Sequence, residues 1–176
     1  MRARPAATAG KQVAHEHGVG AQPARAQAVE MLAAQAQAIR ARRASRRAEL
    51  FSEWERRADQ AVSFALAQRG KPYVWGGTGQ PGFDCSGLVH TAWRKAGVSI
   101  PRVSHSQLRG IRKHVDKDEL RPGDLVFFRG GGHVGMYVGD GKYVHAPHSG
   151  RTVSVEKLDD RSNFVGAVRP GWPAEL

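Results

Sequence analysis

The stretch GFDCSGLVHTAW, residues 82–93, contains the only cysteine of the 176-residue chain. Asp84 stands where a helix N-cap is expected, so that Cys85 falls in the first helical turn. There the free backbone N–H groups and the positive end of the helix dipole favour the thiolate, the nucleophilic form of cysteine. The alternative is that Cys85 is a small buried apolar residue, as most lone cysteines are. The helix itself is indicated by apolar side chains at helical spacing: Leu88, Val89, Ala92, Trp93 and Ala96.

The charge of the chain is strongly positive, with 27 Lys and Arg against 16 Asp and Glu. The excess is spread over residues 1–57 and residues 58–176 alike, and it suits a polyanionic partner such as nucleic acid, an anionic membrane or an acidic cell-wall polymer. A single cysteine excludes an intrachain disulfide framework and a multi-cysteine metal cluster. No apolar run reaches membrane-spanning length, and the first residues lack the apolar core of a signal peptide.

Residues 1–57 are expected to form a basic N-terminal extension. Residues 1–23 are rich in Ala, Gly and Pro without periodicity, which predicts disorder, and residues 24–57 contain neither Pro nor Gly, which favours one long helix or two in sequence. Five arginines gather in the middle of this helical segment, and they form either a solvated helix face or a docking site for an anionic polymer: Arg40, Arg42, Arg43, Arg46 and Arg47.

Residues 58–176 are expected to form one compact domain. A first helix over residues 58–68 stops at Gly70 and Pro72, and a glycine-rich loop follows that lacks the GKS or GKT ending of a phosphate loop. After the cysteine helix, the sequence predicts a strand over residues 125–128, a hairpin around residues 139–141 and further short strands. Helices followed by a run of strands indicate an α+β fold with an antiparallel sheet.

A cysteine nucleophile needs a base within hydrogen-bond reach, and the base needs a third group to orient it. Of eight histidines, His133 and His145 occupy the outer ends of the two hairpin strands, although each alone is more often a half-exposed structural residue. Because side chains alternate along a strand, a tight two-residue turn with regular pairing would put the two rings on opposite faces of the sheet. A three-residue loop, or a bulge with the same effect, would put both rings on one face, as the catalytic hypothesis requires.

Four motifs of the chain occur in register with a known family: KPYVWGGTGQPGFDCSGLV, GVSIPR, LRPGDLVFF and HVGMYVGDGKYVHAP. Together they closely resemble the NlpC-type (NlpC/p-sixty) cell-wall peptidases from about residue 58 to residue 170. The resemblance implies a papain-like α+β fold. It also implies a secreted or cell-wall-associated cysteine endopeptidase that hydrolyses peptidoglycan stem peptides, usually between D-glutamate and the diamino acid.

The resemblance also implies roles for individual residues. It marks Cys85 as the nucleophile, His133 as the base and His145 as the residue that orients the base. Tyr73, Asp84, Ser86 and Arg102 match positions that reach the active site or help to hold the substrate. Val103 stands where the family motif usually has a threonine, so this chain lacks that hydroxyl.

Several other hypotheses are compatible with parts of the sequence. The domain could be a non-catalytic wall-binding module, or an amidase or acyltransferase on the same fold, because fold and triad do not fix the acyl group. The charge also motivates a nucleic-acid binder, but no binding motif supports it. A zinc site made of Cys85, His133, His145 and His148 matches no short ligand motif. We expect a monomer without cofactor or metal and without a membrane span.

Overall fold

A computed structural model describes residues 21–176, and the expectation of disorder for residues 1–20 lies outside the described residues. The chain divides into two units, of which the second comprises Ser45–Leu176. Helix α1 (Ala21–Ala67) is a single helix, and residues 21–23, expected to be disordered, form its first turn. Every described side chain of α1 up to residue 49 is exposed. Within the described residues, no helix combines the length and the apolar character needed to cross a membrane.

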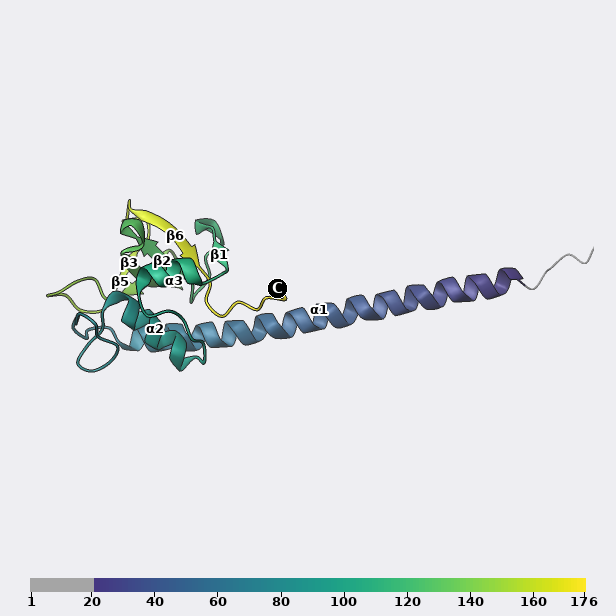
Figure 1. Cartoon of the computed structure of the whole chain (residues 1–176), viewed down its shortest axis with the longest axis horizontal. Helices are drawn as coiled ribbons and strands as arrows, with labels where there is room; N and C mark the ends of the chain where they lie inside the picture. Colours follow the sequence, from purple (N-terminus) through teal and green to yellow (C-terminus); the bar gives the residue numbers. More distant parts are fainter. Residues whose placement is uncertain (1–20) are drawn as a thin grey trace, which may run out of the picture. The chain divides into compact units, whose positions relative to one another are not determined.

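The second unit is built on a six-stranded antiparallel sheet, shown in Figure 1. Its strands are β1 (His114–Val115), β2 (Leu125–Phe128), β3 (His133–Gly139), β4 (Lys142–His145), β5 (Ser154–Lys157) and β6 (Phe164–Val168). They are arranged in the order β1-β6-β2-β3-β4-β5. The sequence LVFF of β2 is apolar throughout because this strand is buried on both faces. The α+β class and the antiparallel sheet predicted from the sequence are confirmed.

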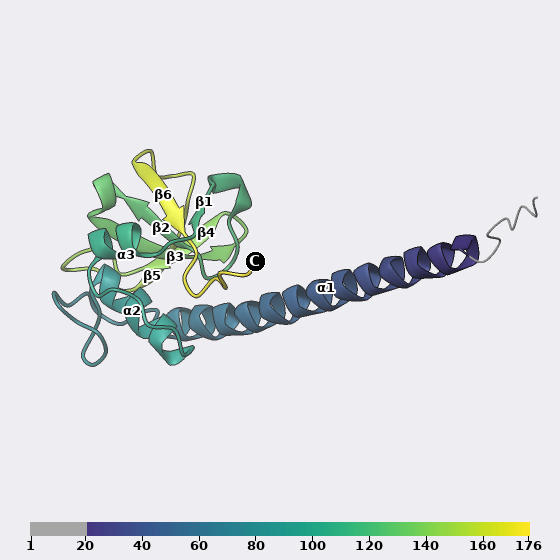
Figure 2. The same ribbon diagram turned by 45° about the vertical axis from the view of Figure 1, so that its right-hand side comes forward.

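One face of the sheet is covered by helices. Helix α2 (Cys85–Lys95) and the last turns of α1 lie on this face (Figures 1 and 2). From α1, Trp54, Ala58, Ala61 and Ala65 enter the core at spacings of four, three and four residues, which is one face of a helix. They pack with the apolar residues of α2 and with alternate residues of the strands.

The boundary expected between residues 57 and 58 falls inside the second unit. Trp54 is buried in the core, and its indole N–H donates to the carbonyl of Pro170 at 2.8 Å. Its ring also packs edge-on against Trp172. The compact unit therefore begins before residue 58, because Trp54 anchors the preceding helical turns to the C-terminal segment.

Helix α3 (Ser104–Gly110) connects the α2 segment to the sheet and was not expected from the sequence. Val103 occupies its N-cap position without a side-chain cap. The helix is held instead by Gln107, whose amide is fully buried and donates to the carbonyls of Ser86 and Pro101 at 3.2 and 2.8 Å. Gln107 thus ties α3 to the N-terminal turn of α2, beside which the candidate site lies.

Candidate active site

Cys85 is the first residue of α2, and the predicted N-cap is confirmed. The Asp84 side chain accepts a hydrogen bond from the Gly87 backbone N–H at 2.6 Å, and the Asp84 backbone is extended. The Cys85 side chain is partly exposed and lines a cleft of about 680 Å³. The helix start therefore presents the thiol to solvent at the end of the helix where backbone N–H groups are unpaired.

The glycine-rich loop packs backbone against backbone around this helix start. A Cβ atom on Gly87 would lie 2.0 Å from the Gly77 carbonyl oxygen, and one on Gly82 would lie 2.0 Å from the Pro72 carbonyl oxygen. The Asp84 N–H donates to the Gly77 carbonyl at 3.1 Å. The glycines are thus required for close approach, and they fix the position of Asp84 and of the cysteine that follows it.

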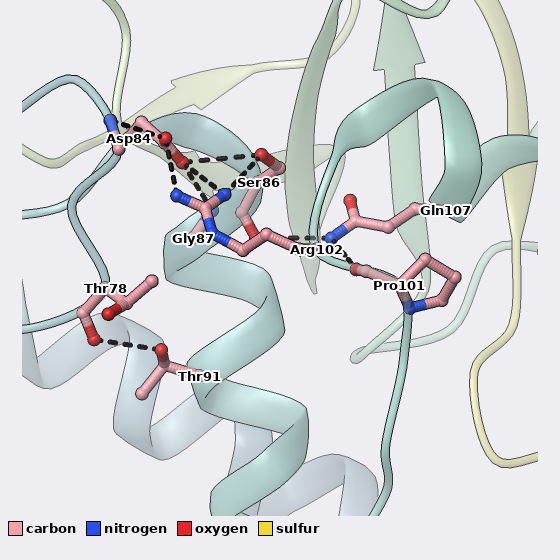
Figure 3. A network of polar contacts seen from close by, with 9 residues as sticks. Thr78, Asp84, Ser86, Gly87, Thr91, Pro101, Arg102 and Gln107 are labelled. Atoms are coloured by element: carbon pink, nitrogen blue, oxygen red, sulfur yellow. Dashed lines mark hydrogen bonds and ion pairs between the residues drawn. The ribbon is translucent and has the colours of Figure 1, made fainter.

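Asp84, Ser86 and Arg102 form one polar network beside the thiol, shown in Figure 3. Arg102 donates to both carboxylate oxygens of Asp84, at 3.0 and 2.7 Å, and to the Ser86 hydroxyl at 2.9 Å. The Gly76 N–H donates to Asp84 Oδ2 at 3.0 Å. Both oxygens of Asp84 are therefore engaged within the protein, and Arg102 compensates a negative charge that lies one residue from Cys85.

His133 and His145 are in contact, because the hairpin contains the bulge that the same-face arrangement requires. The turn is a two-residue loop, Asp140-Gly141, with positive φ at both positions. The pairing shifts by one residue between Tyr137 and Gly139. This bulge brings His133 and His145 to the same face of the sheet, whereas a two-residue loop with regular pairing would put them on opposite faces. His133 Nε2 lies 2.8 Å from His145 Nδ1. The prediction that both rings lie on one face of the sheet is confirmed.

The two histidines occupy different depths. His133 lines the cleft together with Cys85, whereas His145 is fully buried behind it. Since Nε2 of His133 is occupied by His145, Nδ1 is the ring nitrogen left to act on another group. The expected substrate residues Tyr73, Asp84, Ser86 and Arg102 all line the same cleft.

The thiol and the imidazole are both uncharged at neutral pH. Burial raises the pKa of Cys85, and the Asp84 charge adds to this, while the backbone N–H groups of Val134, Ser86 and Cys85 itself oppose it. Burial, followed by the proximity of His145, lowers the pKa of His133 to about 3. The resting pair is therefore thiol and neutral imidazole, and the thiol proton has to move as the nucleophile attacks.

Several residues of the site were not found by sequence reasoning. Gln107 and Glu156 are polar groups that contact the predicted residues, and Trp75 lines the cleft with its side chain 87% exposed. Glu156 could have been identified only from the pairing of β4 with β5. In the part of the chain that the structure describes, no group of three His, Cys, Asp or Glu side chains is placed to hold a metal ion.

A partly exposed cysteine at a helix start, with a histidine pair on an antiparallel sheet beside it, defines a papain-like cysteine peptidase fold. The chain belongs to the NlpC/P60 family, whose match covers residues 70–165. The family expected from the four motifs is thereby confirmed.

Curated relatives of the family are similar to the same part of the chain. A gamma-D-glutamyl-L-lysine dipeptidyl-peptidase from Bacillus cereus is 43% identical, over 64% of this chain and 36% of its own length. The murein DD-endopeptidase MepH from Escherichia coli is 39% identical, over 66% of this chain and 47% of its own length. The chain thus spans less than half the length of these two relatives.

Solved structures share the fold. An NlpC/P60 family protein from Bacillus cereus superimposes with a TM-score of 0.61 at 39% identity, covering 66% of this chain and 40% of that protein. The peptidoglycan hydrolase RipB from Mycobacterium tuberculosis superimposes with a TM-score of 0.61 at 33% identity, covering 67% of this chain and 66% of that protein. The papain-like class expected from the sequence is confirmed by these neighbours.

Proposed function

We propose that this protein is a cysteine endopeptidase that hydrolyses the stem peptides of bacterial peptidoglycan in the cell wall, at the bond between D-glutamate and the diamino acid. The observation that carries the proposal is that Cys85 and His133 line one cleft, while Nε2 of His133 is hydrogen-bonded to Nδ1 of His145. Relatives named as peptidoglycan hydrolases and murein endopeptidases support the substrate class.

The reaction follows from the arrangement of these side chains. Cys85 Sγ attacks the scissile carbonyl carbon while its proton passes to Nδ1 of His133, and the carbonyl oxygen takes up the negative charge. The Cys85 backbone N–H at the helix start can donate to this oxyanion. When the carbon–nitrogen bond breaks, His133 returns the proton to the leaving amine and a thioester remains. Water, deprotonated by His133, then hydrolyses the thioester and restores the thiol.

The charge of the cleft favours an acidic peptide. Asp84 is neutralised by Arg102, and Arg129 also lines the cleft without a carboxylate within 4.0 Å among residues 21–176. A γ-linked D-glutamate carries a free α-carboxylate next to the scissile bond, which an arginine can bind. The named relatives cut different bonds, γ-D-glutamyl in one and a DD cross-link in the other, and this charge argument favours the first.

The expected roles of Tyr73, Asp84, Ser86 and Arg102 in substrate binding remain part of this proposal. The pKa of Tyr73 is raised by burial and by the neighbouring Cys85 and Asp84, so its hydroxyl stays protonated and can donate to a substrate carbonyl or carboxylate. An anionic cell-wall polymer is proposed as a further partner of the arginine cluster, Arg40 to Arg47. Action in the cell wall requires export, so we propose a secreted or wall-associated protein.

The test is incubation with defined muropeptides, both monomeric and cross-linked, followed by mass analysis of the products. Release of L-Ala-D-Glu-containing fragments from the diamino acid is expected, and a Cys85→Ala variant should yield none. Cleavage of the cross-link alone would assign the DD bond instead, and separation of the whole peptide from the sugar would identify an amidase. Unchanged muropeptides with retained sacculus binding would identify a wall-binding module.

A further inference from the structure

Three polar side chains form a line across three adjacent strands: His133 on β3, His145 on β4 and Glu156 on β5. In the β4–β5 register, Tyr143 pairs with Glu156 and His145 pairs with Ser154. Glu156 is therefore the diagonal neighbour of His145 on the same face of the sheet. The Nε2 atom of His145 lies 3.1 Å from Glu156 Oε1. The register of β4 with β5 thus places a carboxylate beside His145, on the side away from His133.

The carboxylate is held in place from its other side. Arg161 donates to Glu156 Oε2 from Nη2 at 2.7 Å and from Nε at 3.2 Å. The Tyr143 hydroxyl donates to the same oxygen at 3.1 Å. Oε1 is consequently left for His145. The contact has the distance of a hydrogen bond but not its angle, so in this structure Glu156 acts on the fully buried ring mainly as a nearby negative charge.

The positions of the protons follow from this order of groups. A neutral His145 beside a carboxylate carries its proton on Nε2, because a lone pair there would face the negative charge. Its Nδ1 is then an acceptor, and the 2.8 Å contact requires His133 to donate from Nε2. The unprotonated nitrogen of His133 is then Nδ1, the atom that has to accept the Cys85 proton.

We propose that Glu156 is a positioning residue of the active site, which sets the tautomers of His145 and His133 and favours transfer of the Cys85 proton to His133. The proposal rests on the function proposed for Cys85 and His133 and adds a fourth member to that set. Glu156 touches neither the thiol nor the cleft, so it acts only through His145.

The charges around these groups agree with this role. Burial raises the pKa of Glu156, but Arg161 and His145 outweigh it and lower the pKa to about 2, so the carboxylate is ionised throughout the working range. Burial and nearby positive groups lower the pKa of His133, and the Glu156 charge acts in the opposite direction. Around the thiol and the three aligned residues lie the following other titratable and charged groups: Tyr73, Asp84, Arg102, Arg129, Tyr143, His148 and Arg161.

The closing experiment uses the reactivity of the single cysteine and needs no substrate. The rate of Cys85 alkylation by iodoacetamide is measured against pH for the wild type, for Glu156→Gln and for a matched control, Asp159→Asn. Asp159 pairs with Lys117 on the surface at 2.9 Å and contacts none of the three aligned residues. In Glu156→Gln we expect alkylation at pH 7 to fall on the order of tenfold, because loss of the charge weakens His133 as the acceptor of the thiol proton. Asp159→Asn should behave as the wild type does.

Two further measurements separate positioning from a merely structural role. On muropeptides, Glu156→Gln should lower kcat by a similar factor with KM unchanged within about twofold, since the residue does not reach the cleft. Nitrogen NMR of the wild-type protein should show the proton of neutral His145 on Nε2. This measurement stays decisive if the Gln variant fails to fold, and Tyr143→Phe, which removes only one bond to Oε2, then serves as the mild variant, with a smaller fall in alkylation.

The outcomes distinguish this proposal from the proposed function. A folded Glu156→Gln variant that alkylates and hydrolyses as the wild type does, or a His145 proton on Nδ1, would overturn the role of Glu156 and leave the peptidase proposal standing. Slower alkylation of Glu156→Gln than of the wild type, in a protein that cleaves no muropeptide, would support the role of Glu156 and remove the substrate assignment.

Discussion

The Arg102 guanidinium and the Asp84 carboxylate meet as two parallel hydrogen bonds, Nη1 to Oδ1 at 3.0 Å and Nη2 to Oδ2 at 2.7 Å. This pair resolves a conflict at the helix start. A carboxylate next to the nucleophile caps the helix but disfavours the thiolate, which the Asp84 charge does here by raising the Cys85 pKa. With Arg102 in place, the cap is kept and much of the negative charge is compensated.

Replacing Arg102 should therefore impair both stability and reactivity. Arg102→Ala leaves Asp84 without its ionic partner, which we expect to cost about 2 kcal/mol of unfolding free energy and to shift the Cys85 alkylation profile to higher pH. Arg102→Lys keeps a charge but not the two-pronged geometry, so an intermediate effect is expected. Arg46→Gln, which removes an exposed 3.7 Å contact to Glu49, is the control. Equal alkylation profiles for Arg102→Ala and the wild type would contradict this account.

The three expected catalytic residues should differ in how severely their loss impairs hydrolysis. Cys85→Ala should abolish cleavage of muropeptides and leave the fold intact, and His133→Ala should be nearly as severe because the base is lost. His145→Asn should be milder, since an amide can still accept a hydrogen bond from His133 Nε2. Product formation is followed by mass, with circular dichroism as the check on folding. Wild-type rates in Cys85→Ala would remove the nucleophile assignment.

Gly135 lies between the two histidines in the hairpin and leaves space for the Tyr143 ring. A Cβ atom at Gly135 would lie 2.5 Å from Tyr143 Cδ2 and 3.0 Å from the Val144 carbonyl oxygen. Gly135→Ala should therefore destabilise the protein by about 1–3 kcal/mol and disturb the His133–His145 contact. Gly79→Ala is the control, because a Cβ there meets no atom within 4 Å and the backbone is not left-handed. Equal urea midpoints for the two variants would show that the sheet adapts without cost.

Stability should fall on acidification through a window set by His133. The folded pKa is lowered to about 3 by burial and by His145, against an ordinary value of 6.5, so between these values the unfolded chain binds more protons than the folded one. The resulting loss should be on the order of 2 kcal/mol at pH 5 relative to pH 7. Thermal unfolding of His133→Asn should depend less steeply on pH, whereas His114→Asn, at an exposed histidine, should keep the wild-type dependence. If stability falls equally with pH in the wild type and in His133→Asn, His133 is excluded as the source of the pH dependence.

What could be predicted from the sequence is what local rules determine. The start of α2 at Cys85 follows from an N-cap aspartate and an apolar period, and β2 follows from an apolar run after a Pro-Gly turn. The need for a bulge or a longer loop follows from side-chain alternation alone, whereas the position of the bulge at residue 138 does not. In each case the deciding residues lie within a few positions of one another.

What was missed depends on contacts between distant segments. Helix α3 has only seven residues and no capping side chain, so neither length nor a start signal marks it, and Gln107 holds it by bonds to Pro101 and Ser86. The approach of Glu156 to His145 requires the β4–β5 register, which the connection over residues 146–153 does not reveal.

The arginine cluster of α1 gives a prediction that does not depend on the active site. Arg40, Arg42 and Arg43 are exposed, whereas Arg46 lies 3.7 Å from Glu49 and Arg47 donates to the Leu176 carbonyl at 3.3 Å. The triple variant Arg40→Gln, Arg42→Gln, Arg43→Gln should therefore remove the charges most available to an anionic polymer and spare those with internal partners. Its binding to purified sacculi should be weaker than that of the wild type at about 0.01 M salt, where exposed charges act over about 30 Å, and the difference should shrink at about 1 M. The corresponding triple Lys variant keeps the charge and should bind as the wild type does. Cleavage of small soluble muropeptides should be the same in all three proteins. Equal sacculus binding by the Gln variant and the wild type at low salt would show that the cluster is a solvated helix face and no docking site.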